Sequence, residues 1–404
     1  MRDRAMNRIC KIIELYGPRL AGSKACRDAA NYLCNEFEKY CDKSGTEDFV
    51  IHPDAFLGWI KIIILSYIVT LVGFWFNLPI VGMICGISSL ILVTFEFVYY
   101  YHFADRFYPS SIGRNVYGII EPDQKVERTI VFSGHHDSAK RFTFYETTPN
   151  LMMIRGGGGL LSFVAINLLS FIFTAMQLYN GESLFNPFKP MSSITRTINI
   201  IMSILLVFVI TAWNFVLDEG TPGAGDNLIT CSIAVELARY YSENRPKNTR
   251  LVFASFDGEE AGLRGSRAFW KNHAKEFGGK NCYNLNVDSP FFLDELTILL
   301  TDINGTISLT ESMGKQIISI GKNLGIFINQ KKIPFMLGGT DAAEAVRAGV
   351  RGMTVIGLPW KPGERESIYH TMKDLPEAIE HIAVESVFKI AMKYIEVAEE
   401  GSLQ

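Results

Sequence analysis

The sequence lacks a large excess of charge of either sign, with 39 lysines and arginines against 42 aspartates and glutamates among 404 residues. Proteins that bind nucleic acid concentrate basic residues against the phosphates, so no nucleic-acid partner is expected. The seven cysteines include no CxxC pair and no spacing typical of a metal site. A disulfide framework is therefore not expected, which favours a reducing compartment.

An apolar signal region is also lacking, because Met1 to Arg4 leads into a charged amphipathic stretch. The first apolar run further along would then have to act as the targeting signal. The glycine run at 155–159 (RGGGG) lacks the GxxxxGK[ST] pattern of a phosphate-binding loop. We interpret this run as a flexible lead-in to an apolar helix.

Long apolar runs are what the sequence does contain. Each is about 20 residues long, enough to cross roughly 30 Å of hydrocarbon as a helix. Aromatic residues stand near the ends of the runs, as in interfacial belts. Four such runs in two pairs disfavour the alternative of buried helices in a soluble protein. The runs cover residues 55–78, 80–101, 160–179 and 197–217.

Four crossings would return the chain to the side on which it started, so all the soluble segments would share one compartment. Basic residues near the membrane are more numerous on that side (Lys61, Arg106, Arg114 and Arg155) than on the other (Lys189 and Arg196). The positive-inside rule therefore predicts a multi-pass integral membrane protein with a cytoplasmic catalytic side.

The four predicted helices exceed what simple anchoring requires, which is one helix. Small residues in the second run allow close helix packing: Gly82, Gly86, Ser88 and Ser89. Three explanations stay open, namely a homo-oligomer interface, a lateral path for apolar peptides, and placement beside a membrane partner.

The soluble segments alternate apolar strands with helices, which predicts an α/β fold with a mostly parallel sheet flanked by helices. Predicted strands lie at 129–133, 250–256, 283–287 and 353–357, and helices begin near Asp226 and at Asp374. The predicted α/β domain is discontinuous, with two transmembrane helical hairpins inserted into it. It comprises residues 1–54, 102–154 and 218–404, and the hairpins comprise residues 55–101 and 155–217.

Candidate site residues follow the predicted strands. His135, Glu260 and Asp288 come at or just after strand ends, where functional residues gather in parallel sheets. With Asp226 and His370 they form a set of two imidazoles and three carboxylates, which suits zinc. Five ligands exceed one tetrahedral site, so we expect two metals that share a bridging carboxylate and a water.

The adjacent pair Glu259-Glu260 can divide two roles, because neighbouring side chains at a strand end diverge. One carboxylate would bind metal while the other takes a proton from the water and returns it to the leaving amine. Taken alone, such a pair is usually just solvated charge. Its position after an apolar strand and beside glycine favours a functional role.

These motifs resemble the zinc-dependent exopeptidases of peptidase family twenty-eight in clan MH, relatives of aminopeptidase Y and of bacterial double-zinc aminopeptidases. The resemblance covers most of the soluble sequence and neither hairpin. His136 stands where the family motif commonly has tyrosine. The matching segments follow in family order: 16–23 (YGPRLAGS), 129–138 (TIVFSGHHDS), 222–227 (PGAGDN), 256–266 (FDGEEAGLRGS), 286–288 (NVD), 339–341 (GTD) and 369–371 (YHT).

The resemblance implies a role for each candidate. His135 and Asp288 would bind one zinc ion, Glu260 and His370 the second, and Asp226 would bridge them. Glu259 would be the general base. The remaining two residues would support the reaction: Asp137 would orient His135, and Tyr369 would donate a hydrogen bond to the oxyanion.

The leading hypothesis is therefore a membrane-embedded dinuclear zinc aminopeptidase that hydrolyses N-terminal peptide bonds with a water activated by Glu259. A carboxypeptidase, a dipeptidase or a glutaminyl cyclase on the same scaffold is the alternative within enzymes. A non-catalytic membrane receptor or scaffold is the alternative from another class. The site would open near the lipid, and its substrates would be peptides found there.

Overall fold

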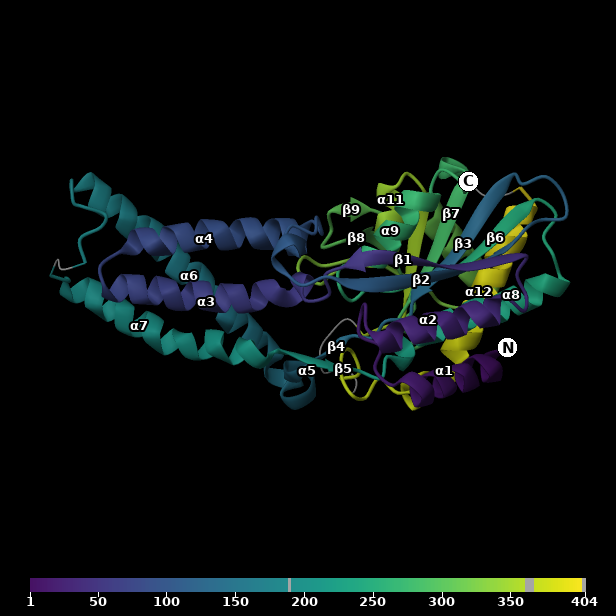
Figure 1. Ribbon diagram of the computed structural model, residues 1–404, viewed down its shortest axis with the longest axis horizontal. Coiled ribbons are helices and arrows are strands. Elements are labelled where there is room, and N and C mark those ends of the chain that lie inside the picture. Colours follow the sequence, from purple (N-terminus) through teal and green to yellow (C-terminus); the bar gives the residue numbers. More distant parts are fainter. Residues whose placement is uncertain (188–189, 360–366, 402–404) are drawn as a thin grey trace.

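A computed structural model describes residues 1–187, 190–359 and 367–401. The molecule is elongated, with an α/β half and a half made of long helices (Figure 1). The helices are α1 (Arg2–Tyr16), α2 (Lys24–Phe37), α3 (Ala55–Trp75), α4 (Pro79–Val93), α5 (Thr143–Thr147), α6 (Met152–Tyr179), α7 (Ser193–Ile210), α8 (Ile229–Glu243), α9 (Arg264–His273), α10 (Glu311–Asn323), α11 (Ala342–Arg347) and α12 (His381–Glu399).

The strands of the α/β half form a mixed sheet. Within the described residues its order is β1-β2-β6-β3-β7-β11-β8-β10, with β9 paired to β8. The four central strands, β6, β3, β7 and β11, are parallel as predicted, whereas β1, β2 and β8 join antiparallel at the flanks. The strands of this sheet are β1 (Lys43–Ile51), β2 (Ser111–Ile120), β3 (Arg128–His135), β6 (Thr249–Phe256), β7 (Cys282–Asp288), β8 (Thr297–Asp302), β9 (Ile307–Ser308), β10 (Asn329–Lys332) and β11 (Arg351–Ile356).

Helices cover both faces of this sheet, so the central strands are apolar on both sides. In β3, Ile130 and Phe132 pack into the larger core with α1, α2, α8, α10 and α12. Val131, which points the other way, packs into a second core with α9 and with residues of α11. The α/β fold predicted from the alternation of strands and helices is confirmed.

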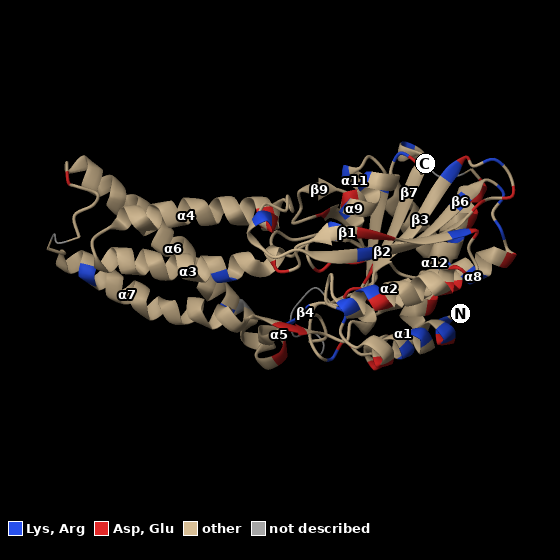
Figure 2. Cartoon of the chain, in the orientation of Figure 1, with Lys and Arg blue, Asp and Glu red and all other residues tan. Residues whose placement is uncertain are grey.

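The other half of the molecule is a bundle of α3, α4, α6 and α7, which we call the helical bundle. All four helices are long and apolar enough to cross a membrane. α3 packs against α4, α6 and α7, and α6 packs against α4 and α7. Lysine, arginine, aspartate and glutamate gather on the α/β half and are sparse on these helices (Figure 2).

Each pair of bundle helices leaves the α/β half from the end of an antiparallel ladder. Ile51 at the end of β1 pairs with Ser111 at the start of β2, and α3 and α4 lie between them in sequence. Phe142 in β4 (Lys140–Phe142) pairs with Val216 in β5 (Val216–Gly220), and α6 and α7 lie between those. Each pair of helices thus connects the ends of two paired strands.

Two local predictions differ from the structure. The glycine run 156–159 lies inside α6, which begins at Met152, so it is helical and not a flexible lead-in. Gly158 packs against Phe208 of α7 and a Cβ there would lie 3.0 Å from that ring, so close helix packing accounts for a small residue at this point. The last helix begins at His381 instead of Asp374, whose carboxylate accepts hydrogen bonds elsewhere.

Candidate metal centre

The carboxyl ends of the central strands converge at one edge of the sheet. β3 ends at His135, β6 leads into the loop that carries Glu259 and Glu260, and β7 ends at Asp288. Because these strands are parallel neighbours, their ends bring the three segments together. Asp226 and His370 come from two loops that close over this edge.

His135 is buried and held by Asp137. Its Nδ1 lies 3.2 Å from the carbonyl oxygen of Asp137 and 3.3 Å from Oδ1 of the same residue. Nε2 faces the other candidate ligands and has no hydrogen-bond partner. A proton on Nδ1 leaves a lone pair on Nε2, which is the tautomer that binds a metal.

Asp226 lies between the two candidate histidines. Oδ1 is 3.2 Å from Nε2 of His135, and Oδ2 is 3.6 Å from Nε2 of His370. Its backbone N–H and that of Gly225 donate to the carboxylate of Asp374, at 3.2 and 2.7 Å. One carboxylate thus presents a separate oxygen to each imidazole, which is the arrangement that a bridging ligand requires.

The loop after β6 carries Glu259 and Glu260 on opposite sides of this centre. Oε2 of Glu260 lies 3.3 Å from Nε2 of His370, and Oε2 of Glu259 lies 3.9 Å from Nε2 of His135. The backbone N–H groups of both glutamates donate to the carboxylate of Asp137, at 3.3 and 3.1 Å. Asp137 therefore positions the loop as well as His135.

Tyr369 and His370 lie in the last of these segments. The two rings stack at 3.8 Å between centroids, and Phe142 contacts the His370 ring edge-on at 4.4 Å. Burial raises the pKa of Tyr369 well above its ordinary value, so the phenol keeps its proton and can donate it to a hydrogen bond.

Two overlapping groups of side chains that could hold a metal ion share His135. His135, Asp226 and Glu260 offer atoms within 4.8 Å of one another, and so do His135, Glu259 and Asp288. The structure thus brings together every residue that the sequence assigned to the metals, the general base and the supporting roles.

Burial and neighbouring carboxylates disfavour the ionised form of several carboxyl groups in this site. Burial raises the pKa of Glu259 well above its ordinary value, and Glu260 and Asp288 raise it further. Burial also raises the pKa of Asp288 to about 7, with Asp226 adding to the shift. Buried carboxylates in such a cluster require cations. The donor set of imidazole nitrogen and carboxylate oxygen therefore fits divalent zinc.

Three buried residues near the site had no assigned role in the sequence. Both carboxylate oxygens of Asp341 lack a hydrogen-bond partner, and burial raises its pKa to about 8. The guanidinium of Arg19 donates to the carbonyl oxygens of Gly17, His136, Pro222 and Gly223. Asp374 supports the Asp226 loop as described above. Arg19 and Asp341 fall within the segments that carry the family resemblance, which was the available signal.

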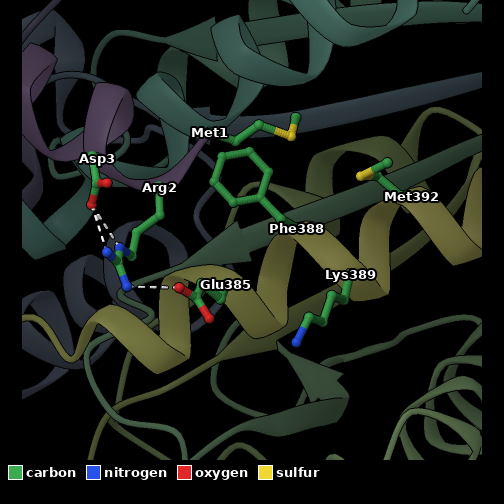
Figure 3. A pocket seen from close by; sticks show the side chains of 7 residues that line it. All are labelled: Met1, Arg2, Asp3, Glu385, Phe388, Lys389 and Met392. Atoms are coloured by element: carbon green, nitrogen blue, oxygen red, sulfur yellow. Dashed lines mark hydrogen bonds and ion pairs between the residues drawn. The ribbon is translucent and has the colours of Figure 1, made fainter.

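A cavity of about 340 Å³ lies away from these residues, between the first turn of α1 and α12 (Figure 3). An ion pair between Arg2 and Glu385, 2.7 Å long, crosses one end of it. The cavity shares no lining residue with the candidate metal centre. Its lining is Met1, Arg2, Asp3, Glu385, Phe388, Lys389 and Met392.

Comparisons with known proteins agree with this fold. The model of Peptidase family M28 matches residues 210–395, which include Asp226, Glu259, Glu260, Asp288 and His370. The match begins at the last residue of α7 and does not include β3. A search of curated proteins found no match to the sequence.

Solved structures share the fold at low sequence identity. A zinc aminopeptidase from Bacillus subtilis aligns with a TM-score of 0.58 and 13% identity, over 98% of this chain and 95% of its own. A glutaminyl cyclase from an Acidobacteriales bacterium aligns with a TM-score of 0.57 and 13% identity, over 99% and 94%. A Zn-dependent exopeptidase from Parabacteroides distasonis aligns with a TM-score of 0.53 and 12% identity, over 98% and 97%.

The fold and the candidate centre, together with the family match, support a metallopeptidase-like hydrolase. This is the class of enzyme predicted from the sequence.

Proposed function

We propose that the protein is a membrane-embedded dinuclear zinc exopeptidase that removes N-terminal residues from peptides. Asp226 supports this proposal most directly, because its two oxygens face two different histidines. His135 and Asp288 would hold one zinc ion and Glu260 and His370 the other, with Asp226 between them. When bound, two zinc ions polarise a substrate carbonyl and lower the pKa of water.

The residues of the chain would then divide the remaining work. Glu259 would take a proton from the attacking water and pass it to the leaving amine, a role that suits a buried carboxylate with a raised pKa. Tyr369 would donate a hydrogen bond to the oxyanion. Asp137 would keep the Nε2 lone pair of His135 directed into the site through its contacts with Nδ1.

Replacing Glu259 tests the mechanism. In Glu259→Ala, kcat for an aminoacyl substrate should fall by about 10²–10⁴-fold, because general acid–base catalysis contributes about that much. Metal content should stay at two zinc ions per chain. Glu311→Ala, at an exposed residue that pairs with Lys315 on α10, serves as the matched control. An active Glu259→Ala would reject the mechanism, and loss of zinc would show that Glu259 is a ligand.

A glutaminyl cyclase is the second candidate, because solved glutaminyl cyclases share the fold over almost the whole chain. That activity would be expected to need one zinc ion instead of two. Counting zinc in the purified protein, together with a screen of peptides that have free, blocked or N-terminal glutaminyl ends, separates the two. In the same screen a carboxypeptidase would require a free C-terminus, and a dipeptidase would cleave free dipeptides alone.

Membrane embedding through α3, α4, α6 and α7 is part of the proposal. The α/β domain would comprise residues 1–54, 102–154 and 218–404 on the cytoplasmic side, with residues 55–101 and 155–217 as transmembrane hairpins. The exposed apolar surface of the four helices supports this arrangement. An impermeant thiol reagent applied to intact cells should label an engineered cysteine at the exposed position Ser183 and not one at the exposed position Lys275. The pattern would reverse if the catalytic side faced outward.

A further inference from the structure

The first pair of bundle helices contacts the loop that carries Glu259 and Glu260. His102, just beyond the end of α4, places its Nε2 3.0 Å from the carbonyl oxygen of Gly262. Phe56 of α3 packs so closely on Gly262 that a Cβ there would lie 2.6 Å from the ring. Helix α3 and the segment that follows α4 therefore both reach the loop.

An ion pair joins the same two parts of the molecule. Glu96 lies in η1 (Thr94–Val98), the turn that continues α4, and it is completely buried. Its Oε1 lies 2.9 Å from Nη2 of Arg264, and its Oε2 accepts a hydrogen bond from Ala104 N–H at 2.8 Å. Arg264 also pairs with Asp105. A carboxylate buried in an apolar helix requires a partner. Glu96 pairs with the first residue of α9, directly after the loop that follows β6.

The backbone of this loop requires support from outside. Gly258 and Gly262 have φ angles of +77° and +83°, and Leu263 has a φ of +61°. The left-handed region is unfavourable for leucine, so neighbouring contacts must hold it there. Asp137 holds the glutamate backbone from the sheet side. Arg264, directly after Leu263, is held from the side of the helical bundle.

We propose that Glu96 and Arg264 are positioning residues, whose ion pair fixes the loop bearing Glu259 and Glu260 against the first pair of bundle helices. On this proposal α3 and α4 are a working part of the metal centre as well as an anchor. The effect on zinc rests on the proposed function, whereas the effect on the loop does not.

The test compares the Glu96→Gln variant with the unsubstituted protein, both full-length and in detergent. Gln keeps the shape but removes the charge, so hydrogen exchange in residues 257–264 should accelerate by about tenfold or more while the central strands stay protected. Zinc at one of the two sites should bind about 10–100-fold more weakly, as when an outer contact of a ligand is lost. The kcat should fall with KM little changed.

Three further variants sharpen the comparison. Glu96→Asp, which keeps the charge, should restore part of the protection and part of the zinc affinity. Glu311→Gln removes an exposed partner of Lys315 and should change none of these readouts. If Glu96→Gln does not fold, Arg264→Lys takes its place in the test. Lysine keeps the positive charge but cannot contact Glu96 and Asp105 together.

Unchanged exchange in residues 257–264 of Glu96→Gln would overturn the proposal, whatever the protein binds or cleaves. Faster exchange confined to that loop supports it even if zinc proves absent, in which case the proposed function fails and the positioning role stands. A loss of protection spread evenly over the α/β half would also overturn it, because the ion pair would then be a general stabiliser.

Discussion

The α/β half and the helical bundle place their polar residues in opposite ways. In the α/β half, Val131 and Leu237 are completely buried, and the lysines, arginines, aspartates and glutamates of the chain gather in this half (Figure 2). In the bundle, Leu161 is 71% exposed, while Ser89 is buried and donates a hydrogen bond to Ser66 of α3. An apolar exterior around a polar seam is what a lipid environment requires, because polar groups there must find partners within the protein.

Removing the metals should have the largest effect, and it should fall on the α/β half alone. A ligand whose free concentration is about 1,000 times its Kd stabilises the folded state by about 4 kcal/mol. Chelation should therefore lower the free energy of unfolding of the α/β half by roughly that amount and abolish activity. Calorimetry with and without chelator measures it, and readdition of zinc is the control. An unchanged transition would contradict a bound metal.

The same experiment has a predicted pH dependence. In the metal-free protein burial raises the pKa of Asp288 to about 7 and that of Asp341 to about 8. A raised folded-state pKa means that stability is fully present below the ordinary value near 4 and is lost as the pH rises through 7 to 8. The Tm of the metal-free protein should therefore decrease as the pH is raised from 5 to 8. A Tm that increases over this pH interval would contradict the raised pKa values of Asp288 and Asp341.

Replacing Arg19 should have the next largest effect. Arg19→Met leaves buried carbonyl oxygens of Gly17, His136, Pro222 and Gly223 without their donor. Each buried carbonyl oxygen left without its donor costs about 1–3 kcal/mol. Chemical denaturation measures the change, with Arg239→Met as an exposed control on α8. Equal effects of the two substitutions would show that Arg19 is not a structural centre of the site.

Matched leucine substitutions test the comparison itself. Leu237→Ala in α8 removes a completely buried side chain and should cost about 2–5 kcal/mol. Leu161→Ala in α6 removes an exposed one and should change stability by less than about 0.5 kcal/mol. Thermal unfolding in one detergent compares them. A large loss from Leu161→Ala would mean that another protein surface covers α6.

Glycines in the bundle give the smallest expected effect. A Cβ at Gly86 of α4 would lie 2.2 Å from Oδ1 of Asn167 of α6, whereas nothing lies within 4 Å of one at Gly156. Gly86→Leu should cost about 1–3 kcal/mol by overpacking. Gly156→Leu should be neutral or slightly stabilising, because leucine favours a helix over glycine. Reversal of this order would contradict the packing of α4 on α6.

The sequence predicted the strand ends and the residues that meet there, because apolar strands followed by His135, Glu260 and Asp288 form a local pattern. It did not predict contacts between distant segments. The pair of Glu96 with Arg264 joins residues far apart in the chain, and periodicity has no signal for such a pair. Asp374 looked like a helix cap from its neighbours, but its carboxylate binds the Gly225 and Asp226 backbone instead.

The error at 156–159 has a different cause. Four consecutive glycines have low intrinsic helix propensity, so a local reading favours a loop. In the structure they extend α6, and the ring of Phe208 lies against Gly158. Packing against a neighbouring helix overrides propensity here.

The two antiparallel ladders that flank the bundle helices impose an order on biogenesis. β1 has no partner until β2 is made, and the ribosome must first complete α3 and α4 between them. Likewise β4 waits for β5 until α6 and α7 have been synthesised. Both helices of each pair are therefore complete before the two strands that flank them can form their ladder.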